Sequence, residues 1–206
     1  MSNVKSADRE LSPEKTEAIL RGAMQEFLEH GYAGARIDKI VAAAGVSKAT
    51  LYRHFADKEA LFTALIQRMA GKANLFQEYD FPPLQEEPTV FLKRVATEML
   101  DNVTQNSYEL SLFRIIVGES GRFPELAQAF VQKIEKPNLD FLTQYFATHP
   151  KLQLAYPEVA ARMFVGTLIH FVIIRDVFYG EAIVPMERDR LVDGLLDLLI
   201  HKNERH

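Results

Sequence analysis

The chain has 206 residues, of which 48% are hydrophobic and 25% are charged, so it is long enough to bury a sizeable core. Its 28 Asp and Glu outnumber its 24 Lys and Arg, and the formal net charge of -4 excludes a protein that binds polyanions through overall positive charge. The absence of cysteine excludes disulfide bonds, a thiol nucleophile, an iron–sulfur cluster and a zinc site built on cysteines.

The first helix is expected between residues 15 and 29, where apolar residues recur at helical spacing. Ser12 and Pro13 suit its start, because serine caps the first turn and proline has a φ angle already suited to a helix. Gly31 follows where a left-handed residue would end the helix.

Residues 37–55 predict two short helices joined by a tight turn. One apolar stripe runs along 37–44, and Gly45 and Val46 form the turn. The next helix opens at Ser47 and has Leu51 and Phe55 four residues apart, on one face. A fourth helix runs from Asp57 into the mid-70s, and residues 78–88 are expected to form a loop.

Five further helices are expected, over 89–105, 108–120, 124–147, 157–179 and 187–202. Pro137 should kink or split the helix 124–147, because it removes a backbone donor and clashes with the preceding turn. No run of residues alternates at period two, so no sheet is expected. The sequence therefore predicts an all-α chain of about nine helices.

Positive charge is concentrated in one short region. Residues 1–60 hold nine basic and nine acidic side chains, so the net negative charge belongs to the rest of the chain. Residues 36–58 hold five basic and two acidic side chains, and they coincide with the helix-turn-helix. A contact with nucleic acid should therefore be local to this region.

Residues 31–61 resemble the DNA-binding domain of TetR-family transcriptional regulators. The resemblance implies an N-terminal three-helix helix-turn-helix DNA-binding domain over 1–58, followed by a helical ligand-binding and dimerisation domain over 59–206. Residues 112–126 resemble the C-terminal domain of the AefR-like subgroup. The residues that carry the first resemblance are the turn Gly45-Val46-Ser47, the segment Thr50-Leu51-Tyr52-x-His54-Phe55 and the segment Asp57-Lys58-Glu59-x-Leu61.

The short helix after the turn suits a DNA major groove, which is about 12 Å wide and admits one helix. With Val46, Leu51 and Phe55 turned inward, the other side chains face outward. Lysine, threonine and histidine donate to phosphates, Ala49 is small enough to contact a thymine methyl group, and Lys58 lies at a helix N-terminus that attracts anions. The expected DNA-binding residues, in line with the family resemblance, are Arg36, Ser47, Lys48, Ala49, Thr50, Tyr52, Arg53, His54 and Lys58.

Arg36 departs from the family pattern, which has serine or threonine at this position. The helix 37–44 should therefore lack its side-chain N-cap, at a cost of about 1 kcal/mol. The Arg36 guanidinium is instead a candidate phosphate contact.

The resemblance also implies a ligand cavity between the fourth and eighth helices, and its apolar and aromatic lining favours a hydrophobic or aromatic small molecule. Ordinary core packing is the alternative for the aromatic residues and methionine, and a satisfied structural hydrogen bond is the alternative for the two polar residues. The candidates for ligand binding are Phe91, Met99, Phe113, Glu119, Phe141, Tyr145, Phe164 and His170.

The apolar run 163–174 is too short to cross a bilayer and too apolar all round for one contact face. The helix 187–202 also carries more apolar surface than one face uses. We expect a homodimer through the helices 157–179 and 187–202, packed as a four-helix bundle, with packing inside one chain as the alternative. With neither a secretory signal nor a membrane span, the protein should be cytoplasmic.

The sequence thus indicates a regulator that binds double-stranded operator DNA, most simply a repressor released by a small molecule. Alternatives are a repressor that senses no ligand, an activator, or a helical ligand-binding or scaffolding dimer without DNA binding. An enzyme is not expected, because residues 118–121 lack the spacing of a nucleophile elbow and the six histidines have no metal-binding spacing. No catalytic residue, metal or cofactor is predicted.

Overall fold

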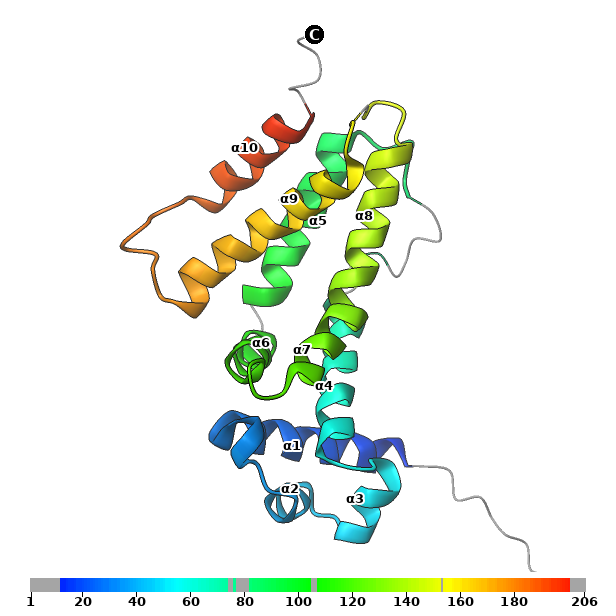
Figure 1. Cartoon of the computed structure of the whole chain (residues 1–206), viewed down its shortest axis with the longest axis vertical. Helices are drawn as coiled ribbons and strands as arrows, with labels where there is room; N and C mark the ends of the chain where they lie inside the picture. Colours follow the sequence, from blue (N-terminus) through cyan, green and yellow to red (C-terminus); the bar gives the residue numbers. More distant parts are fainter. Residues whose placement is uncertain (1–11, 74–75, 77–81, 105–106, 153, 201–206) are drawn as a thin grey trace, which may run out of the picture.

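The computed structural model describes residues 12–73, 76, 82–104, 107–152 and 154–200. Their secondary structure is helical throughout, with ten α-helices and two π-helical segments (Figure 1). The elements are α1 Pro13–Gly34, α2 Ile37–Ala44, α3 Lys48–His54, α4 Lys58–Ala73, α5 Pro88–Thr104, α6 Ser107–Glu119, α7 Pro124–Phe130, η1 Val131–Glu135, α8 Lys136–Thr148, α9 Pro157–Val172, η2 Ile173–Val177 and α10 Arg188–Ile200.

The all-α prediction is confirmed, and within the described residues no strand occurs. Right-handed helical backbone angles continue from α7 through η1 into α8, and from α9 into η2. The twelve elements of the described residues therefore form nine continuous helical runs. The expected helix ends at 105 and 202, and part of the expected loop 78–88, lie outside the described residues.

Pro137 breaks the regular α-helix, as predicted. The N–H of Lys136 bonds to the carbonyl of Val131, five residues back, which makes 131–135 a π-helical turn just before the proline. A proline removes a backbone donor and crowds the preceding turn, and the wider π turn is the form that this disruption takes here.

The caps of the first helices follow local chemistry. Ser12 Oγ accepts a hydrogen bond from the N–H of Lys15, and Gly31, at φ 69°, bends the end of α1. Gly45 closes α2 in the left-handed conformation at φ 64°, as the turn requires. At Gly22 a Cβ would lie 2.9 Å from the Ile40 carbonyl oxygen, so glycine allows α1 and α2 to approach closely.

The predicted lack of a side-chain N-cap at Arg36 is confirmed. The backbone N–H of Arg36 instead donates to Glu26 Oε1 of α1 at 3.1 Å, and Glu26 is buried. The other Glu26 oxygen lies 3.4 Å from His30 Nδ1. A carboxylate from α1 thus satisfies a backbone donor at the start of α2.

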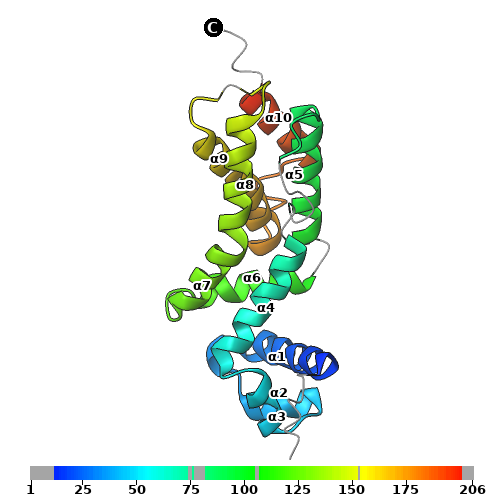
Figure 2. The same ribbon diagram turned by 90° about the vertical axis from the view of Figure 1, so that its right-hand side faces the viewer.

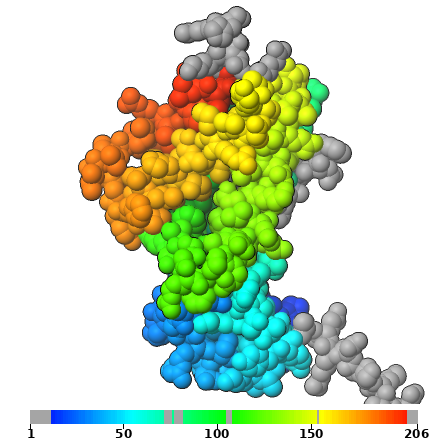
Figure 3. Space-filling model, viewed as in Figure 1, coloured from blue at the N-terminus to red at the C-terminus, as the bar shows by residue number. Residues whose placement is uncertain are grey.

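The buried residues form two cores. The first joins α1 to α4 with Leu112 and Ile116 of α6, Leu126 of α7 and Ile134 of η1. It therefore extends past residue 58, where the sequence places a domain boundary, and that boundary stays a prediction. The second core lies among α5, α8, α9 and α10. In the space-filling view the first helices form a smaller lobe below a larger one (Figure 3).

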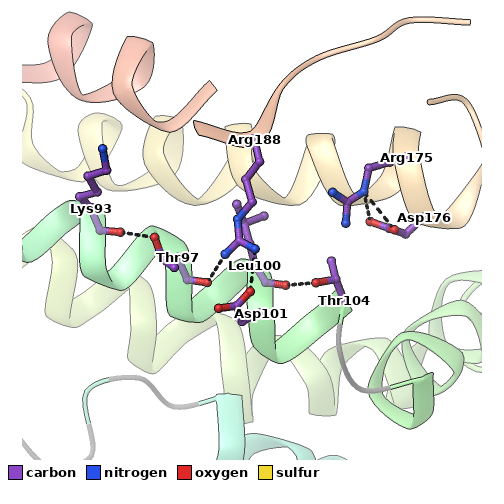
Figure 4. A network of polar contacts seen from close by, with 8 residues as sticks. All are labelled: Lys93, Thr97, Leu100, Asp101, Thr104, Arg175, Asp176 and Arg188. Carbon is purple, nitrogen blue, oxygen red and sulfur yellow. Dashed lines mark hydrogen bonds and ion pairs between the residues drawn. The ribbon is translucent and has the colours of Figure 1, made fainter. Parts of the chain in front are cut away.

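Helix α4 leads from the smaller lobe into the larger one (Figure 2). At the far end of the molecule, α10 lies against α5, where Arg188 donates to Asp101 Oδ1 at 2.6 Å and to the Thr97 carbonyl at 2.8 Å (Figure 4). These bonds hold the N-terminal end of α10. Helix α3 lies at the opposite end of the molecule (Figure 1).

The run Pro157–Val177, made of α9 and η2, is 21 residues long with a mean hydropathy of 1.5, so length and composition alone would allow it to cross a membrane. The apolar run 163–174, which the sequence analysis judged too short to cross a bilayer, lies inside this longer run. Seven residues of α9 are buried in the second core, which accounts for much of its apolar character without a bilayer.

Candidate nucleic-acid interface and ligand cavity

Helix α3 is anchored to the rest of the lobe by Leu51, which is fully buried on its inner face. Four side chains of this short helix are exposed, and Tyr52 keeps 47% of its surface in solvent. The structure therefore leaves open the face that the sequence assigned to DNA. The exposed members of that set on α3 are Lys48, Ala49, Tyr52 and Arg53.

Lys48 forms an ion pair with Asp38 of α2, with 3.0 Å between Nζ and Oδ1. The hydrogen bond from Lys48 lowers the pKa of Asp38, and the same bond raises the pKa of Lys48, so both are charged near neutral pH. Both side chains are more than half exposed. Because such surface pairs contribute little free energy, a phosphate can displace Asp38 from Lys48.

Ser47 and Thr50 cap α3. Ser47 Oγ accepts from the Thr50 N–H at 3.1 Å, and the two hydroxyl oxygens lie 2.9 Å apart. Their first role is therefore to begin the helix, which satisfies a backbone donor that would otherwise be left without a partner.

His54 is turned toward α1, and its assignment as a phosphate donor stays a prediction. Its Nδ1 lies 2.9 Å from Thr16 Oγ1 of α1, and its Nε2 is buried without a hydrogen-bond partner among the described residues. Burial, together with the positive charges of Arg53 and Lys15, lowers its pKa. A neutral His54 therefore ties the C-terminal end of α3 to α1.

In the chain without DNA, Lys58 is likewise turned into the protein, and its assignment to an anion site stays a prediction. Its Nζ donates to three backbone carbonyls, those of Tyr32 at 2.7 Å and of Ala33 and Ala35 at 3.2 Å. The ammonium also lies 4.8 Å from the centre of the Tyr32 ring. Burial lowers the pKa of Lys58. The side chain thus caps the end of α1 and leaves none of its three donors for DNA.

Three further basic side chains of this lobe are exposed. They are Arg36, which precedes α2, Lys39 of α2 and Lys15 of α1, and Lys15 lies close enough to His54 to lower its pKa. The sequence analysis did not include Lys15 and Lys39 among its candidates, because the local sequence does not show that they share this lobe's surface with α3.

A cavity of about 60 Å³ lies where α4, α5, α6, α8 and α9 converge. Of the eight predicted ligand-binding residues, only Met99, Phe113 and Phe164 line it. Most of the remaining lining is apolar. The other described lining residues are Met69, Phe76, Val95, Asn102, Val103, Glu109, Phe130, Ile134, Glu135, Asn138, Leu142, Val165, Ile169 and Val172.

Phe91, Phe141 and Tyr145 pack behind the cavity and do not line it. The Phe91 and Tyr145 rings lie 4.5 Å apart, and Phe141 stacks at 4.1 Å on Phe76, which does line it. Burial raises the pKa of Tyr145. The three residues pack in the core beside the cavity, and their assignment to ligand binding stays a prediction.

The two polar ligand candidates lie elsewhere. Glu119 accepts a hydrogen bond from the Ala33 N–H at 3.2 Å, which is the structural bond that was its alternative. His170 is exposed on α9 beside Ile183 and Val184 of the following loop. The sequence analysis offered both residues as candidates for ligand binding, but neither lines this cavity.

Four polar residues of the cavity were missed: Asn102, Glu109, Glu135 and Asn138. Burial raises the pKa of Glu135. Glu135 lies next to the buried Ile134 in a stretch where Phe130, Asn138 and Leu142 also line the cavity, but a charged side chain gives no apolar signal. Periodicity alone therefore does not place it in the cavity.

Comparison with known proteins identifies the family to which this helical architecture belongs. Residues 19–65 match the profile of bacterial regulatory proteins of the tetR family, and residues 91–201, more than half of the chain, match the C-terminal domain of AefR-like transcriptional repressors. The chain belongs to the TetR family. This confirms both the family and the subgroup that the sequence resembles.

Curated relatives of this TetR-family chain match over the helix-turn-helix region. The transcriptional repressor AcnR of Corynebacterium glutamicum is 43% identical over 56 residues, which are 27% of this chain and 30% of AcnR. The regulator RutR of Escherichia coli K12 is 38% identical over 74 residues, 34% of each chain. The matches thus span about a third of the length of these relatives.

The structural match covers nearly the whole TetR-family chain. The solved structure of the flavonoid-responsive regulator FrrA has a TM-score of 0.77 and 28% identity, and the match covers 93% of this chain and 97% of FrrA. The arrangement of a helix-turn-helix lobe and a helical C-terminal lobe is therefore shared along the chain.

In this TetR-family chain, α6 connects the two lobes. Glu119 at its end accepts a hydrogen bond from the Ala33 N–H. The centres of the nearby Phe123 ring and the Tyr32 ring lie 4.7 Å apart, edge to face. Earlier on the same helix, Phe113 lines the cavity and Arg114 donates to the Asp176 carbonyl and to the Tyr179 hydroxyl. One rigid helix therefore contacts the DNA-binding lobe, the cavity and the end of η2.

Proposed function

We propose that this protein is a dimeric transcriptional repressor that binds operator DNA and releases it when a small hydrophobic molecule fills the cavity. The observation that carries the proposal is the open face of α3, fixed from below by buried Leu51 at the free end of the molecule. Family membership and the repressor relative AcnR support the same reading. Such a protein acts in the cytoplasm, where bacterial DNA is found.

Lys48, Ala49, Tyr52 and Arg53 are the residues proposed to enter the major groove. Arg36, with the newly identified Lys15 and Lys39, is proposed to contact the flanking phosphates. Ser47 and Thr50 first stabilise the start of α3, and contact of their hydroxyl groups with DNA is proposed as a secondary role. His54 and Lys58 contribute by fixing α3 and the end of α1, not by direct contact with DNA.

The proposed dimer forms through the outer faces of α9 and α10. Val159 and Met163 of α9 are 46% and 50% exposed, and Leu198 of α10 is 60% exposed. Gly166 and Gly194 on the same helices have open space where a Cβ would be, so a second subunit can approach their backbones. A two-fold pair would present two α3 helices to successive major grooves, which are about 34–36 Å apart.

The proposed release acts through α6. A ligand that widens the cavity displaces Phe113 and Glu109 of α6, and the same helix holds the end of α1 through Glu119. The displacement changes the position of the DNA-binding lobe only if the ligand binds the released state more tightly. The flavonoid-responsive neighbour FrrA supports a small-molecule effector in this fold.

Operator binding can be tested by fluorescence anisotropy with DNA from upstream of the protein's own gene. Wild-type protein should bind, and the double variant Lys48→Ala, Tyr52→Ala should lose binding while keeping its melting temperature. A matched control is Lys151→Ala, Tyr156→Ala, because these residues are also exposed but lie in the other lobe. Equal binding by both double variants would refute the α3 interface.

If the wild type binds neither its upstream DNA nor any sequence selected from random DNA, the scaffolding dimer without DNA binding becomes the better reading.

A further inference from the structure

Two acidic side chains lie in the basic region 36–58, and they have different partners. Asp57 Oδ1 accepts a hydrogen bond from the Ala60 N–H at 2.7 Å, so this carboxylate caps the start of α4. Asp38 accepts from no backbone donor among the described residues, and its hydrogen bond comes from the Lys48 ammonium of α3. The Asp38 carboxylate therefore belongs to the outer surface that α2 and α3 share.

The ion pair of Asp38 and Lys48 lies where a recognition helix meets the bases. Lys48 is the first residue of α3, and the first residues of a helix in the major groove are those that reach base edges. Its Nζ lies 3.0 Å from Asp38 Oδ1, and the two side chains are 53% and 64% exposed. The pair thus presents a positive donor and a negative acceptor side by side on the face proposed for DNA.

A carboxylate on this face weakens binding to DNA in general. The phosphates repel it, and its pairing with Lys48 occupies a charge that would otherwise attract them. The hydrogen bond from Lys48 lowers the pKa of Asp38, and the first turn of α2 also favours an anion, so the charge persists at neutral pH. A base edge that donates to the carboxylate can offset this cost, whereas a phosphate cannot.

A G·C pair offers the complement of this arrangement in the major groove. Guanine presents the acceptors O6 and N7, and cytosine presents its N4 amino group as a donor. O6 and N4 are themselves hydrogen-bonded in the base pair, about 2.9 Å apart, which is close to the separation of Lys48 Nζ and Asp38 Oδ1.

An A·T pair fits the same two side chains less well. It also offers a donor beside an acceptor, the adenine N6 amino group and thymine O4. Next to O4, however, stands the thymine methyl group, at the place where guanine has N7. The Lys48 ammonium therefore gains a second acceptor at guanine that it lacks at thymine.

We propose that Lys48 and Asp38 together read one G·C pair in each operator half-site, with Lys48 donating to guanine and Asp38 accepting from cytosine N4. This rests on the proposed function, in which α3 enters the major groove. Asp38 is then a specificity-determining residue of α2. It lowers the affinity for every DNA sequence and recovers that loss where a cytosine amino group meets it.

The test begins with duplexes that the full-length wild-type protein selects from random DNA. At each G·C pair of a selected half-site, cytosine is replaced by N4-methylcytosine, which keeps Watson–Crick pairing but carries a methyl group in place of the major-groove N–H. Fluorescence anisotropy should show one pair at which this change weakens wild-type binding about tenfold, and at which 7-deazaguanine, which lacks N7, also weakens it.

Asp38→Ala should bind the methylated and the unmodified duplex with equal affinity at that pair. Asp38→Asn retains an acceptor oxygen, so methylation should still weaken its binding. Glu29→Ala is the matched control, because it removes another exposed carboxylate of the same lobe, and it should respond to both analogues as the wild type does. Melting temperatures show that each variant is folded.

Equal weakening of wild type and Asp38→Ala by N4-methylcytosine would overturn the proposal, because the methyl group would then be excluded by a different side chain. Selected half-sites in which no G·C pair responds to methylation would overturn it as well. The proposed function fails differently. A wild-type protein that selects no sequence refutes both, whereas selective binding that ignores both analogues refutes the base-pair assignment alone.

Discussion

The Glu119 carboxylate accepts a hydrogen bond at 3.2 Å from the backbone N–H of Ala33, 86 residues earlier in the chain. This contact joins the last residue of α6 to the end of α1. The negative charge of Glu119 also acts on Lys58, raising its pKa against the larger lowering by burial, and Lys58 itself holds the Tyr32 and Ala33 carbonyls. The end of α1 is therefore fixed by a carboxylate on one side and an ammonium on the other.

Replacing Glu119 by alanine should lower the free energy of unfolding by about 1–3 kcal/mol, because the partly buried Ala33 N–H loses its charged acceptor. Urea denaturation measures the change. Glu119→Gln should cost less, since its amide oxygen still accepts. Arg122→Ala is the control, because Arg122 is 70% exposed and reaches Glu119 only at 4.0 Å. An equal loss in the control would assign the effect to that ion pair.

Lys58→Met should lower stability by about 1–3 kcal/mol while leaving the salt dependence of DNA binding unchanged. The reason is that Lys58 donates to three carbonyls of the protein. Anisotropy titrations at several salt concentrations give the slope of log K against log salt. A phosphate contact in each subunit would instead reduce the magnitude of that slope by about 2 for a dimer.

Local chemistry predicted the caps and turns of the first lobe, but not the direction of every polar side chain. Gly45 and Ser47 act through their own backbone and the next few residues, so their roles were visible in the sequence. His54 and Glu119 point where they do because of Thr16 and Ala33, which lie 38 and 86 residues away. Spacing along one helix contains no information about such partners.

The cavity shows the same limit. Phe91 and Phe164 are both fully buried at helical spacing, yet only Phe164 lines the cavity. Which buried ring faces a neighbouring helix and which faces a space depends on how the helices pack. Glu135 lines the cavity beside Ile134, although the sequence indicated only that the helix would be interrupted near Pro137.

Asp38→Asn should strengthen DNA binding several-fold at low salt. The substitution frees Lys48 from its ion pair and removes a negative charge from beside the proposed phosphate path. Anisotropy with operator and with random DNA measures the effect, which should shrink as salt rises because both residues are exposed. Glu14→Gln provides a control in the same lobe, since Glu14 is exposed at the start of α1. If the Asp38→Asn variant bound DNA with unchanged affinity, Lys48 would not contact DNA.

Leu198→Glu should shift the protein from dimer to monomer at micromolar concentration without unfolding it. The Leu198 side chain is 60% exposed in one subunit, so a charge there costs little until a second subunit covers it. Sedimentation velocity measures the mass of the species. Val90→Glu on α5 is the matched control, because Val90 is 57% exposed outside the proposed interface. If both variants remained dimeric, the interface would have to lie away from α10.

Glu135→Gln should stabilise the unliganded protein at neutral pH and have little effect in acid. Burial raises the pKa of Glu135 in the folded state above its ordinary value of 4.5. Below the ordinary value both states hold the proton, and the carboxyl then carries no penalty. As the pH rises through the folded-state pKa, the folded protein must hold a poorly solvated carboxylate, so stability is lost.

Thermal unfolding of wild type and Glu135→Gln from pH 4 to pH 8 tests this directly. The two melting temperatures should converge near pH 4 and separate as the pH rises, with the variant the more stable. Asp140→Asn, at an exposed carboxylate of the adjoining helix α8, should follow the wild type across the range. A difference that stays constant with pH would show that Glu135 does not change its protonation in the folded protein.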